Sequence, residues 1–237
     1  MKLDIVLPAY NEEAIITDSV AEIIKKLTPF HVSYRIVVAN NGSTDSTSEY
    51  ARAAGADVIE VPGKGKGRAL AYAALYSEAE YLLFIDADLS ASPSEIQTLW
   101  SIQETEGADI VIGSRLLKKT LVKRSLLRTL SSEVFNLLRS LILGIHVTDT
   151  QCGLKLMNEK GRMVLAECEE TGWFIDMEFL ARAEQKGLLI KEVPISWEEF
   201  RFPNRESKLN LLADGVQAIE AMFRIRSRLK QYGKESL

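Results

Sequence analysis

The first 115 residues alternate short apolar runs with helical patterns, and this alternation restricts the possible folds more than any other feature. Five runs have the length and composition of strands: LDIVLPAY, residues 35–39, DVIEV, residues 82–85 and residues 108–115. Residues 12–27 and 47–54 have helical character, and Gly55 ends the second helix. Repeated alternation predicts an α/β fold with a mostly parallel sheet and helices on both faces.

The order of the elements changes after residue 115. Two further strand-like runs are CGLKLM and LLIKEVPIS, and helices are expected at residues 174–185 and 209–230. The length of 237 residues and the 46% hydrophobic content suit one large domain. We therefore predict a single domain over residues 1–212, followed by a C-terminal helix and tail over residues 213–237.

Composition argues against several classes of protein. The formal net charge is −4, which does not indicate a nucleic-acid partner. Cys152 and Cys168 lack the spacing of a metal site, and so few cysteines suit a reducing, cytoplasmic setting. The sequence enters a strand without the pattern of a signal peptide, and it has no run of about 18 uncharged apolar residues. We expect no membrane-spanning segment.

Two carboxylates follow the apolar run at residues 82–85. Asp86 and Asp88 come where this strand should end, and Ser92 with Glu95 is typical of a helix start. Ligands of open α/β sheets bind at the carboxyl ends of the strands, and hard oxygen ligands suit Mg²⁺ or Mn²⁺. An isolated Asp-x-Asp is more often a solvated turn, so this signal depends on its neighbours.

Polar loops also follow the other strands. Tyr10 could stack on a base, Glu12 could bind a ribose hydroxyl, and the Asn40 amide could accept from a base N–H. The GKGKG loop at residues 63–67 offers amides and cations to phosphate, although it matches neither a dinucleotide-binding nor a P-loop motif. Each loop alone is more simply a turn or a helix start. Together, at successive strand ends of one sheet, they indicate a nucleotide site.

Several motifs, in this order and spacing, resemble those of family 2 glycosyltransferases with the GT-A fold: PAYNEE, NNGSTDST, the glycine-lysine loop, DADLSASP and ADIVIGSR. DTQCGLKLM, GWFIDMEFL and EVPISWEEF followed by ESKL resemble the dolichyl-phosphate glucosyltransferase and mannosyltransferase branch. The match covers nearly all of residues 2–212. It implies a Rossmann-like, mostly parallel sheet flanked by helices, with amphipathic helices in the second half.

The resemblance implies roles for individual residues. The donor-binding residues would be Pro8, Tyr10, Glu12, Asn40, Lys66, Asp86, Arg205 and Lys208. The catalytic residues would be Asp88, Arg115, Lys155 and Asp176, and Asp86 and Asp88 would hold Mg²⁺ or Mn²⁺. The sugar and acceptor pocket would contain Gln151, Trp173 and Glu178.

Four positions qualify this assignment. Asn40 replaces an acid that the family usually has, so the donor base stays open between uracil and guanine. Lys155 replaces an arginine typical of the mannosyl branch, which favours glucose over mannose. Asp176 and Glu178 are two residues apart on a helix and do not share a face, so we expect one of them to point at the sugar.

The expected reaction is inverting transfer of a hexose from a nucleotide-diphosphate sugar to a dolichyl or polyprenyl phosphate. A phosphate acceptor is already an anion, so it requires little help from a general base. The protein would align two anionic groups and neutralise the leaving diphosphate with a metal, Arg and Lys. Two alternatives remain: a family 2 enzyme with a non-lipid or polysaccharide acceptor, and a non-catalytic sugar-nucleotide binding module.

Residues 115–145 mix basic and apolar side chains and contain one acid, Glu133. This composition fits an amphipathic segment on an anionic membrane surface, which would deliver a lipid phosphate. A core-packed or dimer-forming helix would show the same pattern. Because the resemblance favours membrane contact, we expect peripheral attachment at the cytoplasmic face, directly or through a separate membrane partner. A homo-oligomer is a further possibility.

Overall fold

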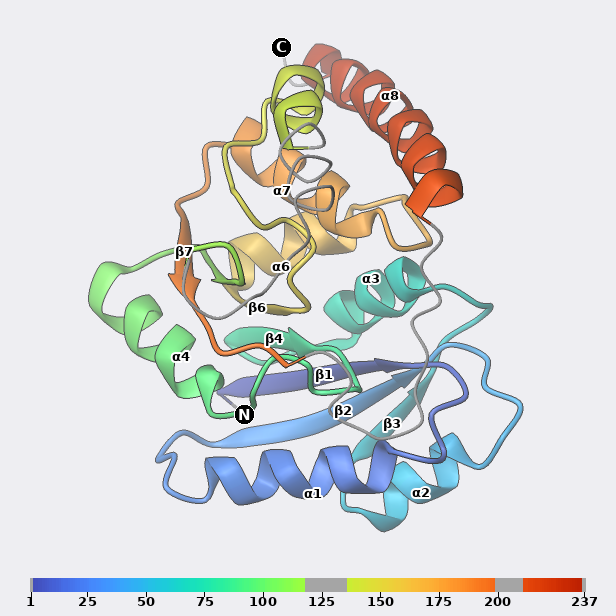
Figure 1. Cartoon of the computed structure of the whole chain (residues 1–237). Helices are drawn as coiled ribbons and strands as arrows, with labels where there is room; N and C mark the ends of the chain where they lie inside the picture. Colours follow the sequence, from blue (N-terminus) through green and yellow to red (C-terminus); the bar gives the residue numbers. More distant parts are fainter. Residues whose placement is uncertain (1, 118–135, 199–210, 236–237) are drawn as a thin grey trace.

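The computed structural model describes residues 2–117, 136–198 and 211–235. Its described strands form one sheet in the order β3-β2-β1-β4-β6-β5-β7 (Figure 1). The strands are β1 (Leu3–Ala9), β2 (Tyr34–Asn40), β3 (Asp57–Glu60), β4 (Tyr81–Ile85), β5 (Ile110–Ser114), β6 (Leu154–Asn158) and β7 (Ile190–Pro194). All neighbouring strands in this sheet are parallel except for the two pairs that β6 makes. The predicted α/β architecture with a mostly parallel sheet is confirmed.

Helices cover both faces of the sheet, with α1 and α2 below it in Figure 1 and α3, α6 and α7 above it. Their bounds are α1 (Ile16–Leu27), α2 (Thr47–Ala53), α3 (Lys66–Tyr76), α4 (Glu95–Glu106), α6 (Glu159–Ala166), α7 (Ile175–Gln185) and α8 (Leu211–Glu235). Residues 136–143 are also helical. The apolar residues of α1 predict a buried stripe of Ile16, Val20, Ile23, Ile24 and Leu27; four of them are buried, whereas Ile24 is 40% exposed.

Strand β4 lies at the centre of the sheet, and its four residues from Leu82 to Ile85 are completely buried. Central strands covered by helices on both faces have continuous apolar sequences, which explains the run LLFI. A fully buried Leu, Ile or Phe side chain contributes about 1.5–3 kcal/mol of transfer free energy. The conformation of this strand is therefore strongly fixed, and so is the place where the chain leaves it.

Strand β6 runs antiparallel between β4 and β5, and this orientation brings the second half of the chain to the end of β4. Ile85, the last residue of β4, pairs with Leu154, the first residue of β6. The loop before β6, residues 149–153, therefore reaches the carboxyl end of β4. The backbone N–H of Asp86 donates to the carbonyl oxygen of Gly153 over 3.1 Å.

Several predicted boundaries were wrong. Helix α1 begins at Ile16, not at residue 12, because Asn11 has a φ of 52° and the Glu12 carbonyl accepts from the N–H groups of Ile15 and Ile16 in a turn. Helix α4 begins at Glu95, and the hydroxyl of Ser92 lies against Ser94 without capping the helix.

Helix α6 (Glu159–Ala166) was not predicted; at its start the side chain of Asn158 accepts from the N–H of Gly161. The predicted division at residues 212 and 213 stays a prediction. Helix α8 already begins at Leu211, and its residues Ala221, Met222 and Ile225 belong to the same hydrophobic core as the sheet. Within the predicted amphipathic segment, residues 118–135 lie outside the described residues.

Candidate active site

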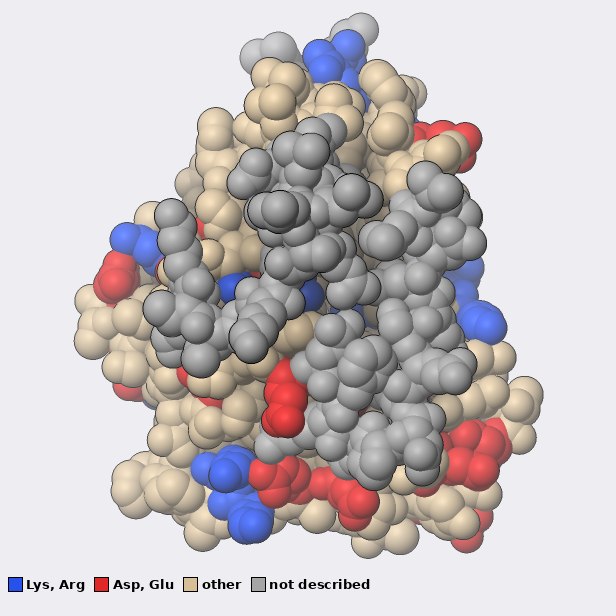
Figure 2. All heavy atoms as spheres, in the orientation of Figure 1, with Lys and Arg blue, Asp and Glu red and all other residues tan. Residues whose placement is uncertain are grey.

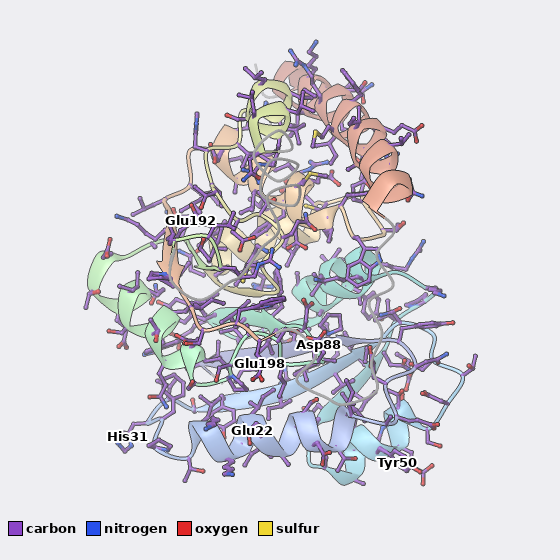
Figure 3. The ribbon with its side chains drawn as sticks, viewed as in Figure 1. Glu22, His31, Tyr50, Asp88, Glu192 and Glu198 are labelled. Carbon is purple, nitrogen blue, oxygen red and sulfur yellow. The ribbon has the colours of Figure 1, made fainter. Side chains whose placement is uncertain are left out.

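Asp86 and Asp88 follow β4 in a tight turn at the carboxyl edge of the sheet. The turn is closed by a hydrogen bond from the Leu89 N–H to the Asp86 carbonyl, and Leu89 has a φ of 50°. The carboxylate of Asp88 accepts from the N–H of Ser90 over 3.1 Å. Figure 3 labels Asp88 just beyond this strand and Glu198 nearby, and the N–H of Glu198 donates to the Ser90 carbonyl over 2.8 Å. The segment after β7 therefore borders the Asp-bearing turn.

Gly153 allows the second half of the chain to approach the Asp86 carboxylate. A Cβ atom at position 153 would lie 1.8 Å from Asp86 Oδ2 and 2.3 Å from its Cγ. Real Cβ contacts of this kind essentially never fall below 3.0 Å, so any larger residue here would force the Asp86 carboxylate to move. The sequence analysis missed this residue, although a glycine beside a strand is a recognised sign of close backbone approach.

The ammonium group of Lys66 lies between two carboxylates from different elements. Lys66 Nζ is 2.7 Å from Asp86 Oδ1 and 3.8 Å from Asp176 Oδ2. Burial lowers the pKa of Lys66, but the attraction of Asp86 and Asp176 raises it by more, so the net shift is upward. Lys66 is therefore charged at neutral pH. The structure brings together Lys66, Asp86 and Asp176, which are 110 residues apart in sequence.

Lys155 is completely buried, and its ammonium group fixes the carboxylate of Asp176. Its Nζ donates to Asp176 Oδ1 over 2.5 Å and to the Cys152 carbonyl over 2.6 Å. Burial raises the pKa of the Cys152 thiol to about 11, so this thiol is protonated at neutral pH and is a poor nucleophile. Because Lys155 has no exposed surface, its geometry favours positioning of Asp176 over the direct phosphate contact that the sequence suggested.

The glycine-lysine loop is fixed against the segment before α7. Cβ atoms at Gly65 and Gly67 would lie 2.2 Å from the carbonyl oxygens of Thr171 and Glu170, respectively. The N–H of Gly65 also donates to the side chain of Asn41 over 3.2 Å. Glycines therefore allow the close contact that holds Lys66 beside the carboxylates.

Arg115 forms a bidentate ion pair with Asp149, the first residue of the DTQCGLK motif. Its Nε and Nη2 atoms lie 2.8 and 2.7 Å from the two carboxylate oxygens, and its backbone N–H donates to the same group. Burial lowers the pKa of Arg115, whereas Asp149 raises it by more. The guanidinium thus stays charged. Its carbon lies 5.5 Å from the ring centroid of Trp197, from the segment after β7.

Asn40 is the last residue of β2, and both the nitrogen and the oxygen of its side-chain amide form hydrogen bonds. Its Nδ2 donates to Ser48 Oγ over 2.8 Å and to Glu60 Oε2 over 2.6 Å, while its Oδ1 accepts from the N–H of Ser43. Glu60, which holds the Asn40 amide, was not among the residues predicted from the sequence. The predicted contact between Asn40 and a base stays a prediction, and it would use the remaining acceptor capacity of Oδ1.

The loop after β1 lies next to that of β2. The N–H of Glu12 donates to Thr47 Oγ1 over 2.8 Å, and Lys64 Nζ lies 3.9 Å from the ring centroid of Tyr10. Pro8 is the penultimate residue of β1 and pairs in register with Ala39 of β2. The structure thus places the predicted nucleotide-binding loops side by side.

The structure separates Glu178 from Asp176, as their spacing on a helix predicted. Glu178 is completely buried, and its carboxylate accepts from Nε and Nη2 of Arg182 and from the N–H groups of Glu169 and Glu170. The sequence does not show which partners a buried carboxylate has, and these four contacts were not predicted. The place of Glu178 in the sugar pocket stays a prediction.

The remaining predicted residues differ in their surroundings. Trp173 is 67% exposed, and its ring centroid lies 5.4 Å from Lys66 Nζ. Gln151 Nε2 is buried and finds no hydrogen-bond partner among the described residues. Arg205 and Lys208 lie outside the described residues.

The donor set at the end of β4 fits a hard divalent cation, because Asp86 and Asp88 supply carboxylate oxygens and Mg²⁺ is typically bound by one or two carboxylates together with substrate phosphates. The described part of the chain holds no group of three His, Cys, Asp or Glu residues that could surround a metal. Such a site would be complete when a diphosphate binds.

Among the described residues on the face shown in Figure 2, lysine and arginine side chains lie in small groups, as do the acidic side chains. No helix within the described ranges is sufficiently long and apolar to cross a membrane.

Curated relatives align with nearly the whole chain. Dolichyl-phosphate beta-glucosyltransferases from Saccharomyces cerevisiae and Dictyostelium discoideum are each 30% identical, over 94% and 95% of this chain and 74% of their own lengths. Glycosyltransferase AglD of Haloferax volcanii is 28% identical over 96% of this chain, which spans 38% of that longer protein.

Solved structures have the same fold. Glucosyl-3-phosphoglycerate synthase of Mycobacterium tuberculosis superposes with a TM-score of 0.68 and 25% identity, over 95% of this chain and 80% of that one. Its complex with Mn²⁺, UDP and glucosyl-3-phosphoglycerate gives a TM-score of 0.66 and 25% identity, over 94% of this chain and 78% of that one. These neighbours confirm the GT-A fold. The model of Glycosyl transferase family 2 matches residues 4–162, and the chain therefore belongs to this family.

Proposed function

We propose that this protein transfers glucose from UDP-glucose to a dolichyl or polyprenyl phosphate, with inversion at the anomeric carbon. The relatives named dolichyl-phosphate beta-glucosyltransferase support both the sugar and the acceptor. The neighbouring synthase with UDP and a glucosyl product supports the base. An α-linked donor would give a β-linked product after one displacement, in agreement with the names of these relatives.

One observation carries this proposal: the two carboxylates after β4 lie among fixed cations. Lys66 is 2.7 Å from Asp86, and Arg115 is held by Asp149 in the loop before β6. A metal held by carboxylates, together with charged lysine and arginine, would neutralise the negative charge that develops on a leaving diphosphate. When bound, Mg²⁺ or Mn²⁺ held by Asp86 and Asp88 would supply further neutralisation of the diphosphate.

The residues of the chain would then orient the reacting groups. Lys155 fixes the carboxylate of Asp176 through a hydrogen bond, and this carboxylate would accept hydrogen bonds from sugar hydroxyl groups. Gln151 Nε2 would donate to the sugar or to the acceptor phosphate, and Trp173 would cover the donor. A phosphate acceptor attacks as an anion, so no residue has to remove its proton. Catalysis would depend on alignment and on charge stabilisation.

A non-lipid acceptor is the second candidate, because the structural neighbour is a glucosyl-3-phosphoglycerate synthase. Both acceptors present a phosphate, although phosphoglycerate accepts glucose on a hydroxyl oxygen. That reaction requires removal of a proton, whereas attack by a phosphate oxygen does not. The two candidates therefore differ in their need for a general base.

Peripheral contact with an anionic membrane would supply a long-chain acceptor. Leu137 and Leu141, in the described part of the basic-apolar segment, are 60% and 69% exposed. Leu141 lines a cavity of about 560 Å³ together with the cations Arg226 and Lys230 of α8. Exposed apolar side chains beside cations are typical of surfaces that lie on anionic lipid. The cytoplasmic face, the separate membrane partner and the homo-oligomer stay predictions.

An acceptor and donor panel tests the proposal. The purified protein with Mn²⁺ would be supplied with UDP-glucose or GDP-mannose, and with a short polyprenyl phosphate or 3-phosphoglycerate. We expect glucosyl polyprenyl phosphate to be the main product. Transfer to 3-phosphoglycerate alone would exclude the lipid acceptor, and donor binding without product on any acceptor would indicate a binding module.

Membrane contact is tested with matched substitutions. Leu141→Glu should weaken binding to liposomes that contain anionic lipid, because it places a charge in the proposed lipid-facing surface. Leu75→Glu is the control, since Leu75 is 66% exposed on α3, outside this surface. Equal loss of liposome binding in both variants would argue against this surface.

A further inference from the structure

Lys66 occupies a position that a divalent cation would have to share. Its Nζ is 2.7 Å from Asp86 Oδ1, and the side chain of Lys66 is only 10% exposed. Asp88 also contributes to the upward shift of the Lys66 pKa, so all three carboxylates of the site attract this ammonium group. A cation that binds Asp86 and Asp88 would meet a fixed positive charge already paired with Asp86.

The backbone of Lys66 has little freedom to withdraw. Gly65 and Gly67 are packed against the carbonyls of Thr171 and Glu170, and the N–H of Arg68 donates to the Thr171 carbonyl over 3.2 Å. A change in the position of the ammonium group must therefore come from the four-carbon side chain. Asp176, 3.8 Å from Nζ, offers it a second anionic partner.

Lys64 provides a contrast within the same loop. It carries the same charge two residues earlier, but its Nζ lies 3.9 Å above the ring of Tyr10. The side chain of Lys64 is exposed, whereas that of Lys66 is almost buried. The two lysines therefore carry the same ammonium group, and they differ in whether that group contacts the carboxylates.

We propose that Lys66 acts as an exchangeable counter-ion of Asp86, which opposes binding of a divalent cation alone and favours binding of the cation together with a nucleoside diphosphate. Without nucleotide, the cation competes with Lys66 for Asp86. When a diphosphate arrives, its oxygens offer Lys66 a new anionic partner, and Asp86 becomes available to the cation. This inference rests on the metal and nucleotide part of the proposed function, and it requires no particular acceptor.

Binding measurements with Mn²⁺ and UDP test this role without any turnover. Free Mn²⁺ would be followed by electron paramagnetic resonance in the absence and presence of UDP. In the wild-type protein, we expect weak Mn²⁺ binding that UDP strengthens considerably. In Lys66→Met, Mn²⁺ should bind more tightly without UDP, by roughly 5- to 150-fold, and UDP should strengthen it less.

Three controls make the result specific. Lys64→Met should keep the wild-type affinity for nucleotide-free Mn²⁺, because Lys64 does not contact the carboxylates. Adding Asp86→Asn to Lys66→Met should remove the gain, which places the cation at Asp86. Lys66→Gln should reproduce the gain, so that the conclusion does not depend on one variant, and thermal unfolding would verify that each variant is folded.

Two results would overturn the inference. One is that Lys66→Met and Lys66→Gln, both folded, bind nucleotide-free Mn²⁺ no more tightly than the wild type does. The other is that wild-type Mn²⁺ binding is insensitive to UDP. Failure of the proposed lipid acceptor would appear in the product panel and would leave these measurements unaffected.

Discussion

The substitution Gly153→Ala is expected to displace the Asp86 carboxylate while leaving most of the fold intact. The new Cβ would lie 1.8 Å from Asp86 Oδ2, and contacts below 3.0 Å essentially never occur, so the carboxylate has to move by about 1.2 Å. Asp86 is a short side chain whose other oxygen is held 2.7 Å from Lys66 Nζ. The displacement must therefore disturb the pairing with Lys66 and the placement of any bound cation.

The expected loss of transfer activity follows from the size of this displacement. Misplacement of reacting groups by 1 Å can reduce catalysis by about 100-fold, which corresponds to about 2.7 kcal/mol of activation free energy. Overpacking of a well-packed region costs roughly 1–3 kcal/mol of unfolding free energy. We expect kcat/KM to fall by about two orders of magnitude, and the free energy of unfolding to fall by roughly 1–3 kcal/mol.

The assay is the initial rate of glucose transfer to a short polyprenyl phosphate at saturating Mn²⁺, together with urea unfolding. Gly215→Ala is the control, because a Cβ there has no atom within 4 Å and the residue lies inside α8. It should keep the wild-type rate and gain about 0.5–1 kcal/mol of stability. Asp86→Asn, which preserves the shape of the side chain, should lose transfer without the clash. If Gly153→Ala folds and keeps the wild-type kcat/KM, the position of Asp86 is not important for transfer.

Three further predictions concern stability and cofactor use. Glu178→Gln should lower the free energy of unfolding by up to about 3–5 kcal/mol in urea titrations, because the buried Arg182 loses its shorter ion pair and keeps that with Glu169 at 3.3 Å; an unchanged midpoint would show that the pair with Glu178 is not important. Chelation with EDTA should abolish transfer and added Mn²⁺ should restore it, whereas activity retained in EDTA would exclude a required divalent cation. Burial raises the pKa values of Asp149 and Glu170, but the ion pairs with Arg115 lower the pKa of Asp149 below its ordinary value, and those with Arg224 and Arg228 together lower the pKa of Glu170 below its ordinary value. Because both folded pKa values lie below the unfolded values near 3.8 and 4.5, the stabilisation is present above those values. It should be lost as the pH falls through the folded values, and a melting temperature that stays constant from pH 7 to about pH 3 would contradict this.

The features that the sequence predicted well are those set by local pattern. Leu82 to Ile85 form a fully apolar run, so a buried strand was predicted, and the two aspartates that follow had to lie at its end. The stripe from Ile16 to Leu27 fixed the buried face of α1 in the same way. Both depend on residues close together in sequence.

Features that depend on distant partners were harder to predict. The run LKLM contains nothing that specifies an antiparallel strand between β4 and β5, because the pairing is decided by the whole sheet. The sequence does not show that Lys155 and Glu178 are buried, because their burial depends on Asp176 and Arg182, which fold against them. Helix α6 was missed because Gly161 disfavours a helix, although Gly161 is needed where α6 packs closely on Ile110 and Met157.

The central position of β6 also determines when a growing chain can complete its sheet. Strand β5 is synthesised 40 residues before β6, yet in the sheet it contacts β6 and β7 and not β4. At about 5–20 residues per second, the ribosome needs roughly 2–8 seconds to add that stretch. During this interval β4 remains an edge strand with unpaired backbone groups, which can pair with another chain. A chain that ends after Ser114 would keep this edge permanently, so premature termination there would favour aggregation over a partly active enzyme.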